Sequence, residues 1–158
     1  MLASKDHRNI WLVIGGWLSV IAALLHIGCI FGGGDWYRFF GAGEEMARVD
    51  ETGSWTPAIL TSGIALILFV WAAYAFAAAG YFRRLPFIRT ALILISAIYL
   101  LRGLAIIPVL IDPSARTAFN IWSSLIVFVY GTVYALGTWK AWAQLSASRS
   151  MQGKGQLA

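Results

Sequence analysis

Residues 88–111 read IRTALILISAIYLLRGLAIIPVLI, an apolar run that carries one arginine, Arg102, in its second half. At about 1.5 Å per residue, a helix of this length spans the roughly 30 Å hydrocarbon core of a bilayer. Arg102 then lies within the hydrocarbon, where insertion scales assign it a cost of about 2.5–3.5 kcal/mol. A charge at that depth needs a partner, so this segment predicts both a membrane span and a site.

The composition of the whole chain agrees with a membrane protein. Of its 158 residues, 59% are hydrophobic and 12% are charged, whereas about 25% are charged in ordinary globular proteins. The formal charge of +5 does not indicate nucleic-acid binding, because Lys and Arg lie beside the hydrophobic runs rather than on an extended basic face. Their expected partners are the anionic headgroups of membrane lipids.

Four apolar runs predict an all-α integral membrane protein with a bundle of four transmembrane helices, in a single domain over residues 1–145. The expected spans are residues 10–31, 56–80, 87–111 and 117–142. Thr56-Pro57 suits a helix start, since proline is favoured at the first helical position. Pro108 is expected to bend the third span. The polar tail over residues 146–158 is predicted to be disordered.

The loop over residues 32–55 is long for a connection and rich in aromatic and acidic residues. Its three leading glycines are expected to end the first helix, and the rest predicts a short interfacial helix at the level of the lipid headgroups. The alternative is a lid over the outer mouth of the bundle, with a carboxylate reaching Arg102. The candidates for the lid or for that ion pair are Asp35, Trp36, Glu44 and Glu45.

The distribution of charge predicts the orientation. Eight basic residues lie on the side of the two termini: Lys5, Arg8, Arg83, Arg84, Arg89, Lys140, Arg149 and Lys154. The other side has Arg38, Arg48 and Arg116. The positive-inside rule then places both termini in the cytoplasm, with the chain in the inner (plasma) membrane of a bacterial-type cell.

With this topology, polar side chains gather in the outer half of the bundle. Arg102 lies roughly 15 Å from the outer end of its helix, and His26 lies about 8 Å from the end of its own. If the helices are rotated so that their polar stripes face one another, they enclose a pocket open to the outside. Its expected ligand contacts are Arg102, His26, Tyr99, Ser62, Asn120, Ser123 and Tyr130.

Each of these residues also has a structural reading. The alternatives to a ligand-facing role for Arg102 are hydrogen bonds to backbone carbonyls freed by Pro108 and an ion pair with a loop carboxylate. His26 alone is more often a hydrogen-bonded interface histidine than a ligand or base. Tyr99 and Tyr130 are of a type that packs in the core with a hydrogen bond to spare.

Several kinds of chemistry are not indicated. Cys29 is the only cysteine, so the chain offers neither an internal disulfide nor a C-x-x-C pair. His26 is the only histidine within a span, which leaves no paired ligands for haem and no Glu-x-x-His pair for a metal. We therefore predict no metal and no cofactor. No recognisable catalytic set is present, and His26 would be the acid or base of any reaction.

Two functions fit this pattern. The first is a membrane protein whose outward-facing polar pocket binds a lipid-like molecule or a small amphipathic, hydrophobic one through Arg102. The second is an accessory or structural subunit of a larger membrane complex or of a homo-oligomer, with Arg102 in an internal ion pair. Small-residue ladders, such as the one that includes Ala73 and Ala77, favour the second. The outward layer of polar residues favours the first.

Overall fold

The computed structural model describes residues 8–83 and 85–154, and the side chains of these except at residues 144 and 146–154. The described chain has no strand. Its elements are α1 (Ile10–Phe39), α2 (Glu44–Glu51), α3 (Thr56–Ala78), α4 (Ile88–Leu104), α5 (Ile106–Ile111), the 3-10 turn η1 (Pro113–Ala115) and α6 (Ala118–Lys154).

Four helical segments among the described residues are long and apolar enough to cross a membrane. They are Ile10–Phe39, Thr56–Ala78, Ile88–Ile111 and Ala118–Ala143. The predicted all-α class and its four long apolar helices are thus confirmed. This set of helices suggests a multi-pass membrane protein.

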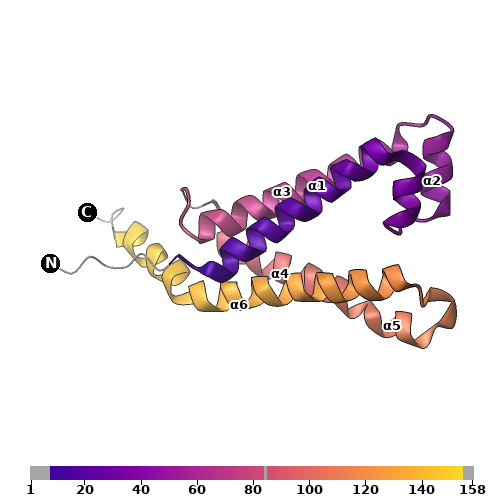
Figure 1. Cartoon of the computed structure of the whole chain (residues 1–158). Coiled ribbons are helices and arrows are strands. Elements are labelled where there is room, and N and C mark those ends of the chain that lie inside the picture. The colour runs from indigo at the N-terminus through magenta and orange to yellow at the C-terminus, as the bar shows by residue number, and fades with distance from the viewer. Residues whose placement is uncertain (1–7, 84, 155–158) are drawn as a thin grey trace.

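The long helices associate as two pairs. α1 packs along α3, and α4 packs along α6. We call the α1–α3 pair the first arm and the α4–α6 pair the second arm. The arms lie together near the start of α1 and diverge toward the other end, where α2 covers the first arm and α5 ends the second (Figure 1).

Small residues let the arms approach closely near the termini. A Cβ on Gly15 of α1 would lie 3.0 Å from the ring of Tyr134, and one on Gly137 of α6 would lie 2.8 Å from the side chain of Leu12. The Asn9 side chain, which precedes α1, donates a hydrogen bond to the Gly137 carbonyl at 2.6 Å. These contacts hold α1 against α6 near the start of α1, and beyond them the two helices diverge (Figure 1).

The glycine triplet bends α1, although it was expected to end the helix. Gly33 has φ 65° and ψ −154°, a backbone conformation that is essentially restricted to glycine. The helix resumes after this residue and continues to Phe39. Gly32 is required for a different reason, because the indole of Trp36 occupies the place where a Cβ would project. The bend turns the segment after Gly33 back toward α2.

Pro108 divides the third predicted span. Its ring clashes with the carbonyl four residues earlier, which belongs to Leu104, and α4 ends at that residue. The turn tightens at the break, where the Ala105 amide donates to the Arg102 carbonyl at 3.3 Å. The expected bend is present, and it places Arg102 in the last turn of α4.

The fourth long helix continues beyond its predicted end. α6 extends to Lys154, whereas the expected span stops at residue 142. The segment predicted to be disordered, residues 146–158, therefore begins inside a helix. Residues 155–158 lie outside the described residues.

Candidate functional site

The two arms meet at a buried cluster of hydroxyl groups. Ser19 of α1 forms hydrogen bonds with the hydroxyls of Tyr99 on α4, at 2.9 Å, and of Tyr134 on α6, at 2.8 Å. Tyr134 also donates to the backbone carbonyl of Trp71 on α3, at 3.3 Å. All four long helices thus contribute to this cluster, which we call the floor.

The direction of the hydrogen bonds in the floor follows from its last member. A backbone carbonyl can only accept, so Tyr134 donates to Trp71. Ser19 then donates to Tyr134, and Tyr99 donates to Ser19. Each of the three hydroxyls in the floor is therefore hydrogen-bonded, which is what a buried polar network requires. The ring of Trp71 stands edge-on to Tyr99, with centroids 4.9 Å apart.

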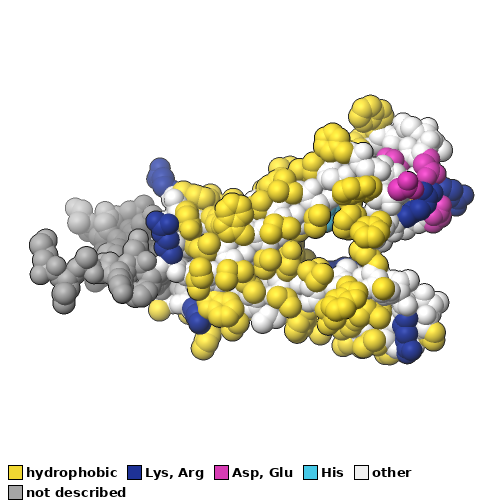
Figure 2. Space-filling view, viewed as in Figure 1, with side chains coloured by type: hydrophobic (Ala, Val, Ile, Leu, Met, Phe, Trp, Pro, Cys, Tyr) yellow, Lys and Arg dark blue, Asp and Glu magenta, His cyan; other side chains and the backbone are white. Residues whose placement is uncertain are grey.

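Beyond the floor the arms separate and enclose a cleft. Figure 2 shows this gap in the side of the molecule, with a histidine on the wall of the first arm and a basic side chain on the wall of the second. At the end that carries α2 and α5, which we call the outer end, the arms touch again, where the Phe119 ring of α6 fills the space in which a Cβ on Gly41 would project. Between the floor and this contact, no hydrogen bond, ion pair or ring contact between described residues joins the arms.

Arg102 is the charged residue of the cleft. Its side chain is exposed, and its Nη1 donates to Ser124 Oγ of α6 at 3.5 Å, a long hydrogen bond. None of the carboxylates in the described part of the chain forms an ion pair with it. A guanidinium has five N–H donors. Most of the binding capacity of Arg102 is therefore open to a molecule in the cleft.

His26 faces the same section of the cleft from the first arm. It lies seven residues beyond Ser19 on α1, about 10 Å above the floor, and Ser124 lies ten residues from Tyr134, about 15 Å above it. His26 Nδ1 is 2.8 Å from the Ala22 carbonyl. Since that carbonyl accepts, Nδ1 carries a proton. In the neutral ring Nε2 is then an acceptor, and in the charged ring it is a second donor.

The remaining predicted contacts are divided between the floor and local structure. Tyr99 is buried in the floor, and the half-buried Tyr130 stacks edge-on against it at 5.6 Å. Asn120 donates to the Ala115 carbonyl at 2.9 Å, and Ser123 donates to the Asn120 carbonyl at 3.3 Å, so both serve the start of α6. Ser62 is exposed on α3.

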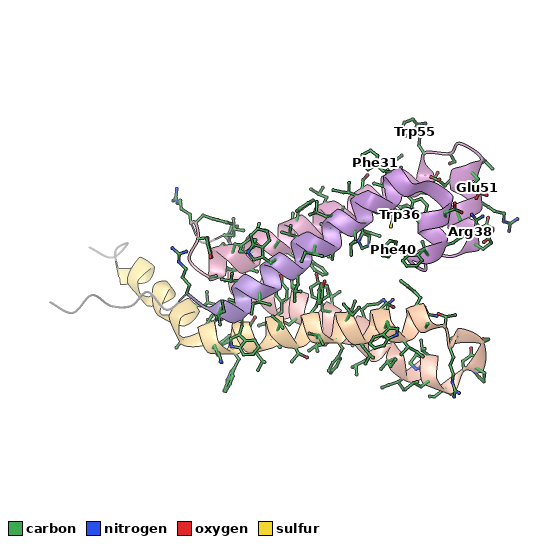
Figure 3. The ribbon with its side chains drawn as sticks, viewed as in Figure 1. Phe31, Trp36, Arg38, Phe40, Glu51 and Trp55 are labelled. Carbon is green, nitrogen blue, oxygen red and sulfur yellow. The ribbon has the colours of Figure 1, made fainter. Side chains whose placement is uncertain are left out.

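The acidic residues of the outer loop gather around a different arginine. Arg38 binds Glu44 with Nε at 2.8 Å and Nη2 at 3.0 Å, and its Nη1 binds Glu51 at 2.6 Å. Asp35 lies 3.5 Å from the same guanidinium. Glu45 pairs with Arg48 at 3.1 Å. Figure 3 shows Arg38 and Glu51 together at the outer end of the first arm. In this structure the three acidic candidates therefore pair with Arg38 or Arg48 rather than with Arg102, and Glu44, together with Glu51, holds α2 onto α1. Trp36 packs against Gly32 of its own helix.

We expect this attachment to be lost in acid. The hydrogen bond from Arg38 lowers the pKa of Glu44 and that of Glu51. A carboxyl whose pKa is lower in the folded state stabilises it above the unfolded pKa of about 4.3, and the contribution disappears as the pH falls through the folded pKa. Hydrogen exchange of the α2 amides should therefore become faster below about pH 4 relative to α3. In Arg38→Gln, exchange should already be fast at pH 7.

Arg48→Gln is the matched control, because Arg48 pairs within α2 and bonds nothing on α1. Its α2 amides should exchange like those of the wild type at pH 7. Equal protection of α2 in Arg38→Gln and in the wild type would contradict the role of Arg38.

Three residues of this region are not found by reasoning from the sequence. Arg38 could have been found from Asp35, since charges three residues apart share a helix face. Gly41 and Phe119 are far apart in the chain and carry no local signal of contact. In the described part of the chain, no three His, Cys, Asp or Glu side chains are grouped to hold a metal ion. Comparison of the chain with protein-family models, curated proteins and solved structures finds no match.

Proposed function

We propose that this chain is a multi-pass inner-membrane protein that binds an amphipathic ligand in the cleft between its two arms. Arg102 contacts the polar, anionic part of the ligand, and the apolar walls contact the rest. His26 and Ser124 supply further hydrogen bonds. The ligand is held rather than transformed, because one arginine and one histidine do not form a recognised catalytic set.

The observation that carries the proposal is that Arg102 faces the cleft without a carboxylate partner among the described residues. An arginine within the hydrocarbon costs several kcal/mol unless it is paired or hydrated. Here it faces a cleft, with one long hydrogen bond and no described carboxylate beside it. A bound anion would remove that cost through charge-assisted hydrogen bonds to the planar guanidinium.

The alternative role as a docking subunit loses part of its basis in this structure. Of the two small residues named for the docking ladder of α3, Ala77 is buried inside the chain itself and Ala73 is half-buried, and their neighbours Ala72 and Ala75 are buried as well. Gly16 of α1 faces the Phe76 ring of α3 in the same way. Small residues that pack one arm are not free to pack a partner.

The proposed orientation, with both termini in the cytoplasm, rests on the two ends of the molecule. Basic residues next to the termini lie over aromatic rings, in the pairs Arg8–Tyr81, Arg89–Trp142 and Lys140–Trp11. Acidic residues gather at the opposite end (Figure 2). This distribution suits the positive-inside rule and an aromatic belt in the inner leaflet. At the outer end, α2 would lie among the lipid headgroups, with the exposed Trp55 and Phe39 dipping into the interface.

Binding can be tested by thermal unfolding of the purified protein in detergent, with and without a lipid extract. A ligand of the native state raises the unfolding midpoint by mass action, by about 5–10 °C at a hundredfold excess over Kd. We expect this shift in the wild type and its loss in Arg102→Ala. Arg102→Lys should retain only part of it, because an ammonium lacks the planar fork.

Arg48→Ala is the control for the loss of one positive charge, since Arg48 lies on α2 outside the cleft. It should respond to the extract like the wild type. Equal shifts in the wild type and in Arg102→Ala would exclude binding through Arg102. If Arg102→Ala does not fold, Arg102→Lys replaces it in the test: a shift smaller than that of the wild type supports binding through Arg102, and an equal shift excludes it.

A further inference from the structure

The cleft is closed at both of its ends and open at its side. Toward the termini it stops at the floor, where Ser19, Tyr99 and Tyr134 are buried. Toward the outer end it stops at the contact between Gly41 and Phe119, which we call the bridge. Figure 2 shows the gap as a window in the side of the molecule, with hydrophobic side chains along both of its edges. The sides of four apolar helices are the surfaces that face lipid in a membrane.

The bridge is an aromatic plug. The Phe119 ring lies directly on the backbone of Gly41, which has φ 70° and leaves no room for a side chain. On the first arm, Phe40 and Trp36 stand next to this point with ring centroids 5.6 Å apart, on the side that faces the second arm (Figure 3). A hydrated anion coming from the aqueous side would have to pass these rings.

We propose that the ligand is a membrane lipid with an anionic headgroup, and that it reaches Arg102 sideways through the window rather than through the outer mouth. This inference rests on the proposed function and adds the class of ligand and its path. The acyl chains remain along the apolar edges of the window. The headgroup, a phosphate or carboxylate, accepts hydrogen bonds from Arg102 and Ser124.

Charge complementarity selects the headgroup. Among the described residues Arg102 is the one charged side chain of the cleft wall, and no described carboxylate neutralises it. An anionic head is therefore favoured over a zwitterionic one, whose own positive group would face Arg102. His26 Nε2 on the opposite wall accepts a hydrogen bond from a headgroup hydroxyl when the ring is neutral.

The test separates a lipid from a soluble anion of the same chemistry. The protein is placed in phosphatidylcholine nanodiscs, and the probes are phosphatidylglycerol added to the disc and glycerol 3-phosphate added to the water. We expect phosphatidylglycerol to raise the unfolding midpoint of the wild type by about 5–10 °C and glycerol 3-phosphate to leave it unchanged. Arg102→Gln should lose the response to phosphatidylglycerol.

Phe119→Ala opens the outer mouth, so glycerol 3-phosphate should then raise the midpoint. Phe31→Ala is the matched control, because Phe31 is 88% exposed at the same end and lies on the side of α1 away from the second arm (Figure 3). It should behave like the wild type. Phe119→Leu, which also removes the ring, replaces Phe119→Ala if that variant does not fold.

The outcomes distinguish this inference from the proposed function. If glycerol 3-phosphate stabilises the wild type as well as it stabilises Phe119→Ala, the ligand reaches Arg102 from the water and sideways access is overturned, while binding through Arg102 stands. No response of Phe119→Ala to glycerol 3-phosphate would overturn the role of the bridge. If Arg102→Gln responds to phosphatidylglycerol like the wild type, the proposed function itself fails.

Discussion

Replacing Tyr134 with alanine is expected to lower the free energy of unfolding by about 3–5 kcal/mol, the range for removing a buried aromatic side chain. Tyr134 has no exposed surface, and its ring fills the space between α6 and Gly15 of α1. The helices cannot close this cavity easily, because Leu12 against Gly137 already holds α1 against α6 nearby. Loss of packing contacts is therefore the larger part of the effect.

Hydrogen bonding adds a second, smaller part. Without Tyr134, the proton of Ser19 loses its acceptor, and the Trp71 carbonyl loses the side-chain donor that it has beside its helical hydrogen bond. Tyr134→Phe isolates this part, since it keeps the ring and removes only the hydroxyl. We expect it to cost about 1–2 kcal/mol, because each net hydrogen bond contributes about 0.5–1.5 kcal/mol. The ratio of the losses in free energy of unfolding, Tyr134→Ala over Tyr134→Phe, measures how far packing exceeds hydrogen bonding in the floor.

Reversible unfolding in mixed detergent micelles, followed by circular dichroism, measures these differences. Trp139→Ala is the control on the same helix, because Trp139 is 71% exposed. It should change the free energy of unfolding by less than about 0.5 kcal/mol. A cost in Tyr134→Ala no larger than that of Trp139→Ala would show that the floor does not hold the arms together.

Some parts of this fold can be predicted from the sequence. The four apolar helices can be, because length and composition determine whether a segment is able to cross a bilayer. Pro108 predicts the end of α4 through a local clash. The second span, expected over residues 56–80, is found as Thr56–Ala78 for the same reason.

The pairing of the helices could not be predicted. Helix rotation and the divergence of the arms depend on contacts between distant residues, such as Phe119 with Gly41, and a single sequence carries no signal of these. The glycine triplet interrupts α1, as three glycines are expected to do, but a second helical segment follows the positive φ of Gly33, and no local signal predicts that it continues to Phe39. Polar residues such as Arg102 could be named as candidates, but their partners could not.

The second large effect is expected at two glycines where the helices of the second arm touch. A Cβ on Gly103 of α4 would lie 2.6 Å from Cα and 2.7 Å from N of Phe128, and a Cβ on Gly131 of α6 would lie 2.7 Å from the amide nitrogen of Leu100. The nearest atoms at both places belong to backbone, which cannot rotate away as a side chain can. Gly103→Ala and Gly131→Ala should therefore force α4 and α6 apart, each at a cost of about 1–3 kcal/mol.

Gly63→Ala is the control, because Gly63 is a helical glycine of α3 with nothing within 4 Å of its Cβ position. Alanine is favoured over glycine in a helix by about 1 kcal/mol. Gly63→Ala should therefore be neutral or slightly stabilising in the same unfolding assay. A similar gain in Gly103→Ala would show that the two helices of the second arm are not in close contact.

The double variant distinguishes a local clash from separation of the whole helix pair. Gly103 faces Phe128 and Gly131 faces Leu100, so these two close contacts lie one helical turn apart, where α4 and α6 face each other. If one alanine moves α4 as a rigid body, it also makes room for the second. The combined cost of Gly103→Ala and Gly131→Ala should then be smaller than the sum by about 0.5–3 kcal/mol, the range for coupled neighbours. Costs that add fully would mean that each helix yields only locally. Because Arg102 precedes Gly103 and reaches Ser124 on α6, rigid separation should also weaken the proposed binding of a ligand by Arg102, whereas local yielding at Gly131 should not.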